Sequence, residues 1–447
     1  MALKGLDIFK LSPKKNCKEC GNPTCMAFCM KVAQGAASLD ACPYFSSDAI
    51  AKLSEATAPP MKTIKVGDYS LGGETVMFRH DKTFVSRTRY SVFVCSGMDD
   101  AEIDARIAKI GQVDYERIGE RMIAEMVTVN YSDKKDADAY YALIEKVKPA
   151  LNGRVIILNC ADAAVAEKAL EAVKGLPVIL NGANEGNVDE MNKLATAAGV
   201  VLGVKAASLD ALHDMIEKLE AAGNKNLVID ATADTLKETW SNVVRIRRAA
   251  IKNSDRTFGY PTIVNGHKLA MGDSHKQEAL AALFTVRYGS IFVMDEMDYA
   301  KALPLYGLRQ NIFTDPQKPM KVQPGIYPIN HGDENSICLT TVDFALTYFV
   351  VSGELERSGV PCNLLISDAG GYSVLTSWAA GKFSASSIAK FIDEFEIPTK
   401  IKNRKLVIPG KVAVLKGELE SKLPDWEIIV APNEAVQLVK FLRDMNK

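Results

Sequence analysis

Eight short runs of apolar, largely β-branched residues constrain the fold of this chain most strongly. They are SVFVCSG from Ser91, MVTVNY from Met126, VIILNC from Val155, PVILNG from Pro177, VVLGVKA from Val200, LVIDAT from Leu227, PTIVNG from Pro261 and SIFVMDE from Ser290. Amphipathic segments with helical spacing separate most of them, as in 162–175, 208–223 and 276–289. Any single run could equally be a buried helix segment, so the prediction rests on their number. Eight strands alternating with helices over roughly 220 residues predict a (β/α)8 TIM barrel, which we place at 91–310.

Two segments rich in Pro and Gly flank the barrel region. The first contains Pro59, Pro60, Gly72 and Gly73 between short alternating runs, and it predicts a linker carrying a hairpin at 58–90. The second, 304–336, has five prolines and little periodicity, and it predicts another linker at 311–335.

The C-terminal region, 336–447, contains a helix-like segment at 340–359 and three strand–loop–helix units that begin with CNLLISD, KLVIP and WEIIVAP. This alternation indicates a parallel, Rossmann-like sheet. Such sheets bind ligands outside the carboxyl ends of their strands, which here are the loops DAGGYS, PGK and APNE. We expect Gly370, Gly371 and Gly410 to allow close approach of a ligand, with free helix N-terminal amides as donors.

Five cysteines lie in the thirty residues from Asn16 to Phe45. Four of them, Cys17, Cys20, Cys25 and Cys42, form the pattern C-x2-C-x4-C-x16-C, and Pro43 follows the last. A compact run of thiolates with one remote Cys-Pro ligand is typical of iron–sulfur ligation, whereas structural zinc sites usually show two close pairs. The pattern therefore favours a [4Fe-4S] cluster domain at 1–57 over a zinc site, and both over free thiols.

The other cysteines have simpler interpretations. Cys29 follows Cys25 by one helical turn in an apolar segment, so we interpret it as a small buried hydrophobe. The remaining four lie in or beside predicted strands, and we expect them in the core: Cys95, Cys160, Cys338 and Cys362.

Polar residues stand at the ends of the predicted barrel strands, where barrel enzymes place their active sites. They are Asn130, Asn159, Asn181, Asp230, Asn265, Asp295 and Glu296. Asn and Asp are also common in turns and caps, which is the usual role of any one of them. Three similar contexts, ILNC, ILNG and IVNG, suggest a polar rim for an amide-rich or glycan-like ligand, or for a partner protein.

The five histidines show no metal-ligand spacing. A corrinoid-type D-x-H-x-x-G motif would supply an axial ligand, and its nearest approach is DSHKQE, where Glu278 replaces the glycine. We interpret this segment as a loop entering a helix, with Asp273 or Ser274 as the N-cap.

Charge and hydropathy exclude several classes of protein. The formal net charge is -1 without a long charged run, so we expect no nucleic-acid or membrane partner. The N-terminal residues contain no uninterrupted apolar region of a signal peptide, and no later run reaches spanning length. We therefore expect a cytoplasmic protein, and in that reducing compartment clustered cysteines favour metal or redox centres over disulfides.

The chain resembles a known family over nearly its whole length. The head KNCKECGNPTCMAF, the predicted barrel, and the segments TTVDFALTYFVVSGE, SVLTSWAAGKF and RKLVIPGKVAVLKGELE are similar to large subunits of the corrinoid/iron–sulfur protein of the reductive acetyl-CoA pathway. The resemblance implies a heterodimer with a small barrel subunit. It also implies a methyl group carried on cobamide cobalt, accepted from a methyltetrahydrofolate methyltransferase and delivered to acetyl-CoA synthase.

The same resemblance assigns roles to the cofactors. The cluster, fed by a low-potential electron donor, would reduce cobalt(II) that forms when cobalt(I) is oxidised. The absence of an axial-histidine motif fits a cobamide bound base-off. The chemistry would take place on cobalt, so no side chain is expected to be catalytic and the chain would act as a methyltransferase component.

The resemblance also implies the residues that contact the cobamide. Thr340 and Thr347 would lie on the TTVDFALTYF helix, followed by a loop, a second helix and the APNEA segment, and these later contacts are Gly370, Gly371, Tyr372, Ser373, Thr376 and Asn433. For each Thr, the alternative is a helix hydroxyl bonded to its own backbone.

Two other functions remain open from the sequence. One is a barrel methyltransferase that acts directly on a methyl-pterin at Asn130, Asn159, Asn181 and Asp230. The other is an electron-transfer subunit that binds no cobamide.

Overall fold

The computed structural model describes residues 5–33, 37–46, 49–50, 53, 59–315 and 320–446. Residues 54–58, at the end of the predicted cluster domain, and 316–319, inside the predicted second linker, lie outside the described residues. The chain forms two compact units, Met1–Val113 with Ala124–Phe313, and Asp114–Ile123 with Thr314–Lys447.

The N-terminal head contains three short helices, α1 (Gly5–Lys10), α2 (Cys25–Ala33) and the 3-10 helix η1 (Leu39–Ala41). Ile8 and Phe28 are almost fully buried between them, together with the sulfur of Cys29. Because this core is small, we expect the head to depend on additional cross-linking by its cysteines or a metal.

A hairpin precedes the barrel, as predicted. Its strands β1 (Thr63–Val66) and β2 (Tyr69–Gly72) are antiparallel. A buried ion pair follows, in which the Arg247 guanidinium lies 3.1 Å from the Glu74 carboxylate and also donates to the Val76 carbonyl. Since Glu74 also accepts from the amides of Val85 and Ser86, this pair fastens the segment after the hairpin to the barrel.

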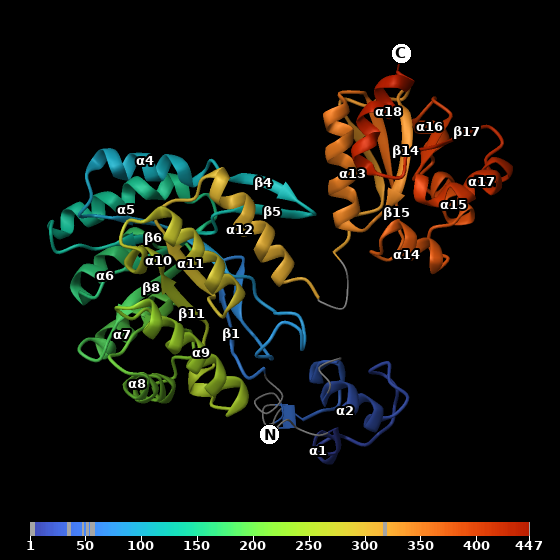
Figure 1. Ribbon diagram of the computed structural model, residues 1–447. Helices are drawn as coiled ribbons and strands as arrows, with labels where there is room; N and C mark the ends of the chain where they lie inside the picture. The colour runs from blue at the N-terminus through green and yellow to red at the C-terminus, as the bar shows by residue number, and fades with distance from the viewer. Residues whose placement is uncertain are drawn as a thin grey trace. The chain divides into compact units, whose positions relative to one another are not determined.

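The eight predicted runs form one closed barrel of parallel strands, seen from cyan to yellow in Figure 1. Each strand is rich in Val and Ile and is buried between the barrel interior and the surrounding helices, as a parallel sheet requires. The prediction of a TIM barrel is confirmed. The strands are β3 (Arg89–Cys95), β6 (Met126–Asn130), β7 (Val155–Asn159), β8 (Val178–Ala183), β9 (Val201–Val204), β10 (Leu227–Asp230), β11 (Thr262–Asn265) and β12 (Ile291–Met294).

Helices follow the barrel strands, and side-chain caps fix where most of them begin. Asp162, Ser208 and Thr235, for example, each accept a hydrogen bond from the backbone amide three residues later. The barrel helices are α4 (Asp100–Ile110), α5 (Ala137–Leu151), α6 (Ala163–Ala172), α7 (Val188–Ala198), α8 (Leu209–Ala221), α9 (Leu236–Lys252), η2 (Arg256–Phe258), α10 (Gly266–Ala270), α11 (Ser274–Val286) and α12 (Tyr299–Ile312). A hairpin of β4 (Asp114–Arg117) and β5 (Glu120–Ile123) follows α4 in the chain.

The C-terminal part contains a five-stranded sheet in the order β13-β15-β14-β16-β17. Four strands are parallel and β13 is antiparallel to β15. The strands are β13 (Gly325–Ile329), β14 (Ile337–Val342), β15 (Cys362–Ser367), β16 (Lys405–Ile408) and β17 (Glu427–Val430).

Helices cover both faces of this sheet (Figure 1). Leu355 and Leu442, from α13 and α18, pack on the face that carries Leu364. Ile388 and Leu419, from α15 and α17, belong to the core on the other face. The helices are α13 (Ala345–Ser358), α14 (Val374–Ala379), α15 (Ala385–Glu394), α16 (Ile397–Lys400), η3 (Gly410–Leu415), α17 (Lys416–Lys422), η4 (Ala435–Gln437) and α18 (Leu438–Met445).

The structure differs from two expectations drawn from the sequence. Thr340 was expected on a helix, but it belongs to the central strand β14, and α13 begins only at Ala345. The β-branched run ICLTTV suits a buried strand between β15 and β16 better than a helix. The strand β13 also lies inside the segment expected to be a linker.

Candidate functional site

The loop that carries Cys17 and Cys20 has an unusual backbone. Lys14, Asn16 and Lys18 all have positive φ, at 54°, 49° and 68°, and Gly21 has 73°. Non-glycine residues in this region are strained and cluster at functional sites. Loops that contain left-handed residues can turn backbone amides toward one side, which suits an anionic group such as an iron–sulfur cluster.

Two asparagines tie this loop to the thiols. The Asn16 side chain accepts from the Cys25 amide at 2.8 Å, and the Asn16 amide donates to the Cys25 sulfur at 3.3 Å. The Asn22 amide group donates to the Cys20 carbonyl at 2.9 Å and to its sulfur at 3.8 Å. Such N–H···S contacts help to set the potential of a bound cluster. Cys25 and Cys42 are buried, Cys20 is partly buried and Cys17 is exposed.

Cys29 is fully buried in α2 beside this group. Burial raises the pKa of its thiol to about 11, although a hydrogen bond with Ser12 opposes the shift. A thiol that stays protonated is a poor metal ligand. Its role as a buried hydrophobe remains a prediction.

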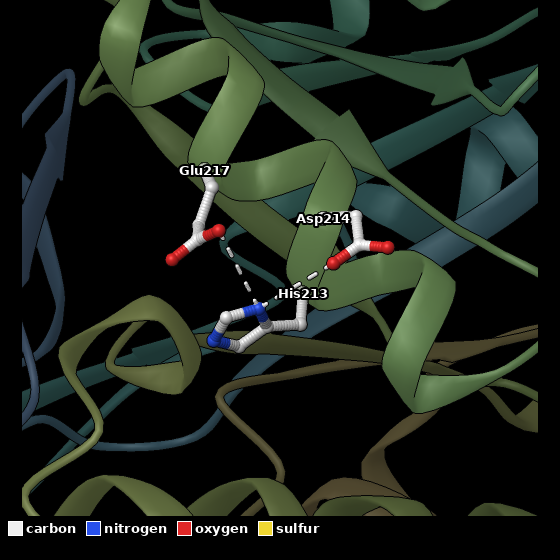
Figure 2. Close-up of side chains that lie close together, drawn as sticks. All are labelled: His213, Asp214 and Glu217. Atoms are coloured by element: carbon white, nitrogen blue, oxygen red, sulfur yellow. Dashed lines mark ion pairs between the residues drawn. The ribbon is translucent and has the colours of Figure 1, made fainter.

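Figure 2 shows another group that could contact a metal ion, formed by His213, Asp214 and Glu217 on α8. The imidazole Nδ1 lies 3.8 Å from Asp214 and 3.9 Å from Glu217, and both carboxylates are largely exposed. Its Nε2 lies 3.7 Å from Asp255, and the ring packs against Phe258. These long contacts are those of a solvated helix face, and they indicate no metal site.

A cavity of about 340 Å³ opens at the carboxyl ends of the C-terminal strands. It lies where β14, β16 and β17 end and where α13 and α14 begin, the position at which open α/β sheets bind ligands. Its polar and apolar lining residues include Thr340, Thr341, Leu346, Thr347, Val350, Ser373, Leu375, Gly410, Lys411, Asn433 and Glu434.

Two hydroxyls in this lining have no protein partner. Thr340 and Thr341 are 4% and 2% exposed, and the Oγ1 atom of each makes no hydrogen bond with another described residue. Buried hydroxyls are normally satisfied. A bound ligand with amide or other polar groups would pair with them, so the lining fits a cobamide, which carries amide side chains around an apolar macrocycle.

The structure brings together four of the eight residues predicted to contact a cobamide. Thr340, Thr347, Ser373 and Asn433 line the cavity. The other four are not among its lining residues: Gly370, Gly371, Tyr372 and Thr376. The Tyr372 ring is covered by the Lys382 ammonium at 4.8 Å, and the Thr376 hydroxyl is 3.0 Å from that of Ser373.

Asp343 organises the loop that contains these glycines, and sequence reasoning missed it. This fully buried carboxylate accepts from the amides of Ala369 and Gly371 at 3.0 and 2.9 Å, and it pairs with Lys321 at 3.3 Å. The Asp368 carboxylate accepts a hydrogen bond from the Gly370 amide in the same way. Carboxylates of the same chain therefore take the loop amides of Gly370 and Gly371, whereas the expectation of free helix N-terminal amides stays a prediction.

Apolar side chains surround the cavity. Leu346, Val350 and Leu375 line it and remain 62%, 48% and 47% exposed. Exposed apolar groups at a concave site suit a large apolar ligand face or a partner surface.

The barrel mouth carries the amide row expected from the strand ends. Asn159 donates to Asn130 at 2.5 Å, and Asn181 donates to Asn159 at 2.9 Å and to Asp230 at 3.3 Å. Asn265 instead caps α10 by accepting from the Lys268 amide. Asn265 therefore has a structural role as a helix cap.

Asp295 joins a second polar group at the mouth. It lies 2.5 Å from His267 Nδ1, 2.9 Å from Arg106 and 2.9 Å from the Gln277 amide group. Burial opposes ionisation of the carboxyl group, but these partners outweigh it and lower the pKa of Asp295 to about 2. Glu296 pairs with Lys301 at 2.6 Å. Asp295 and Glu296 therefore both have structural partners.

Within the described part of the chain, no helix is long and apolar enough to cross a membrane.

Comparison with known proteins gives matches along nearly the whole chain. The family model for the CO dehydrogenase/acetyl-CoA synthase delta subunit matches residues 65–442, and a model for an Fe-S cluster matches residues 13–44. The corrinoid/iron-sulfur protein large subunit of Moorella thermoacetica is 37% identical and covers 99% of this chain and 99% of its own length. The acetyl-CoA decarbonylase/synthase complex subunit gamma of Methanopyrus kandleri is 32% identical over 98% of this chain and 97% of its own.

Among solved structures, dihydropteroate synthase from Thermus thermophilus is similar to this chain at 15% identity and a TM-score of 0.38. The match covers 56% of this chain and 97% of the synthase. A match at this score carries no argument about function.

Proposed function

Because this chain belongs to the family of corrinoid/iron–sulfur protein large subunits and acetyl-CoA decarbonylase/synthase gamma subunits, we propose that it carries a methyl group on a bound cobamide. The methyl group is accepted from methyltetrahydrofolate through a methyltransferase and delivered to acetyl-CoA synthase. The chain is a methyltransferase component whose own side chains bind and orient the cobamide.

The cavity at the C-terminal strand ends is the observation that supports this proposal most directly. It combines exposed apolar residues, such as Leu346 and Leu375, with the unpartnered hydroxyls of Thr340 and Thr341. An amide-bearing macrocycle needs both kinds of surface. When bound, the cobamide supplies a cobalt centre that accepts and releases a methyl group.

The residues of the chain hold the cofactor in place. Thr340, Thr347, Ser373 and Asn433 would bond its amides and nucleotide tail. Asp343 acts indirectly, since it fixes the loop from Ala369 to Gly371 beside the cavity. The cobamide is proposed to bind base-off, as the resemblance implies.

The head would hold a [4Fe-4S] cluster through Cys17, Cys20, Cys25 and Cys42. The strained loop and the N–H···S contacts of Asn16 and Asn22 support this assignment. When bound there, such a cluster would supply the electron, received from a low-potential donor, that reduces cobalt(II) to cobalt(I). The partners proposed with it are a small barrel subunit in a heterodimer, the methyltransferase and acetyl-CoA synthase, all in the cytoplasm.

The visible spectrum of the heterodimer, purified anaerobically, tests the proposal. We expect corrin bands together with broad cluster absorbance, and cobalt bound to this chain. Thr340→Val, which keeps the shape of the side chain, should lower bound cobalt severalfold, whereas Thr399→Val on exposed α16 should leave it unchanged. A spectrum with cluster absorbance and no corrin bands would instead favour an electron-transfer subunit and overturn the proposal.

A further inference from the structure

The N-terminal head carries more positive charge than the rest of the chain. Residues 5–46 contain five lysines and three acidic residues, whereas the whole chain has a formal net charge of -1. Three of these lysines, Lys14, Lys15 and Lys18, are exposed in the cluster loop, the residues 11–24 between α1 and α2 that carry two of the proposed cluster ligands. The positive charge of the head is therefore concentrated around the proposed cluster.

The ammonium groups of the cluster loop are not used in ion pairs. The Lys15 ammonium lies 3.8 Å from the ring centre of Tyr44, and that of Lys14 lies 5.7 Å from the ring centre of Phe9. Lys14 and Lys18 also occupy two of the strained left-handed positions of the loop. Among the described residues, no carboxylate pairs with any of the three lysines. Their charges are therefore available to a partner.

The single acidic residue of the cluster loop is bound to the head itself. The Glu19 carboxylate accepts a hydrogen bond from the Tyr44 hydroxyl at 2.8 Å. Three lysines and one glutamate leave the loop with a net charge of +2. A surface of this charge attracts an acidic protein and repels a basic one.

The same loop carries the most accessible of the proposed ligands. Cys17 is exposed, whereas Cys20 is partly buried and Cys25 and Cys42 are buried. Because electron transfer slows steeply with distance, an electron enters a cluster most readily at the ligand that a partner can approach. A cluster held by four thiolates is itself negatively charged and repels an acidic protein. Lys18, the residue after Cys17, and the other two lysines offset this repulsion at the point of entry.

We propose that the cluster loop is the docking surface for an acidic one-electron carrier protein, whose carboxylates meet Lys14, Lys15 and Lys18 while its redox centre faces Cys17. One electron passes, so the carrier is oxidised by one electron and the cluster is reduced by one electron, without transfer of a proton or a bond. This inference rests on the proposed cluster, and it adds the class of the electron donor and the surface that the donor uses.

Titration of the anaerobic, full-length heterodimer with an oxidised acidic ferredoxin tests the surface by binding alone. Lys14→Gln combined with Lys18→Gln should weaken binding tenfold or more at a salt concentration of about 0.02 M. The matched control is Lys10→Gln combined with Lys31→Gln, which removes two exposed ammonium groups of the same head outside the loop. The control should change the affinity less than threefold. At about 0.5 M salt, where charges are screened beyond about 4 Å, the two double variants should bind alike.

The rate of cluster reduction separates docking from an effect on the cluster itself. Reduced ferredoxin should reduce the cluster of the Lys14→Gln, Lys18→Gln variant at least fivefold more slowly than that of wild type. Reduced methyl viologen is a small cation that needs no basic surface, and it should reduce both proteins at rates within twofold. If the double variant loses iron, Lys15→Glu repeats the comparison at a position without positive φ, with Lys31→Glu as its control.

Unchanged affinity in the loop variants, equal weakening by the loop and control variants, or equal slowing with methyl viologen would overturn the docking surface. Iron content, cobalt content and the corrin spectrum are measured on the same samples. Absence of corrin bands would overturn the methyl-carrier role and leave the binding result standing. Unchanged affinity in loop variants that contain iron and cobalt would overturn the docking surface alone, so failure of one proposal can be told from failure of the other.

Discussion

The Thr340 hydroxyl should lower the stability of the cobamide-free chain but strengthen the binding of cobamide. This buried hydroxyl has no partner among the described residues, and an unpaired buried polar group costs about 1–3 kcal/mol. Thr340→Val should therefore stabilise the cobamide-free chain by roughly 1 kcal/mol while weakening its affinity for cobamide. Tryptophan fluorescence during urea unfolding measures the first effect, and cobamide titration measures the second. A variant that loses stability and keeps its affinity would show a purely structural hydroxyl.

Cys42 and Cys29 are both buried but should respond differently to substitution. Cys42→Ala should remove a cluster ligand, lower iron content and abolish reductive reactivation, while methyl transfer by chemically reduced protein persists. Cys29→Ala is the matched control and should retain iron, with a packing loss of about 1 kcal/mol. Iron analysis and electron paramagnetic resonance check both variants. If Cys29→Ala lost the cluster and Cys42→Ala kept it, the ligand assignment would be reversed.

Asp295 makes the stability of the barrel depend on pH. Its partners lower the folded-state pKa from 3.8 to about 2, so its contribution is complete above about pH 4 and declines as pH falls toward 2. The side chain is 18% exposed, and the shift corresponds to about 2 kcal/mol. Calorimetry should show Asp295→Asn destabilised at pH 7, with the gap to wild type narrowing at pH 3. If the difference in stability between Asp295→Asn and wild type did not change with pH, the charge of Asp295 would contribute nothing to stability.

At the scale of elements, the segment after the first hairpin depends on one buried ion pair. Arg247 is 4% exposed and Glu74 is 5% exposed, and removal of one partner leaves the other charge buried. Arg247→Met alone should cost about 3–5 kcal/mol. Adding Glu74→Leu should recover part of that loss, because neither charge then remains. A double-mutant cycle in urea measures how far the two substitutions depend on each other. If their effects on the free energy of unfolding were simply additive, the ion pair would not be coupled as we expect.

The elements differ in how far they could be predicted. The barrel strands could be found because each is a buried apolar run, and eight of them leave few alternatives. The strand β14 was mistaken for the start of a helix, since TTV is compatible with either period and only its pairing with β15 and β16 decides. The antiparallel β13 was hidden in a Pro-rich segment because its partner β15 lies more than thirty residues later.

The same limit applies to the candidate sites. The spacing of Cys17, Cys20 and Cys25 reveals a local ligand set, because neighbours in sequence are neighbours in space. Asp343 could not be assigned from the sequence, since its bonds to Ala369 and Gly371 span 26 and 28 residues. The residues that line a cavity depend on side-chain direction, which sequence spacing does not give.

At the scale of the whole molecule, the chain separates its tasks along the sequence. The thiols lie in the N-terminal head, the amide row lies in the barrel, and the cavity with Thr340 lies in the C-terminal sheet. A variant in one site should therefore leave ligand binding at the others intact. The family membership unites the head and the C-terminal cavity in one proposed role, that of a methyl carrier with its own electron supply.

Transfer of an isotopically labelled methyl group tests this role most directly. The anaerobic heterodimer is reduced chemically and incubated with labelled methyltetrahydrofolate and the methyltransferase, and the protein-bound label is compared with the cobalt content. We predict label equal to cobalt in wild type, label that falls together with cobalt in Thr340→Val, and label that then passes to acetyl-CoA synthase. Cobalt-loaded, folded protein that takes up no label would contradict the account.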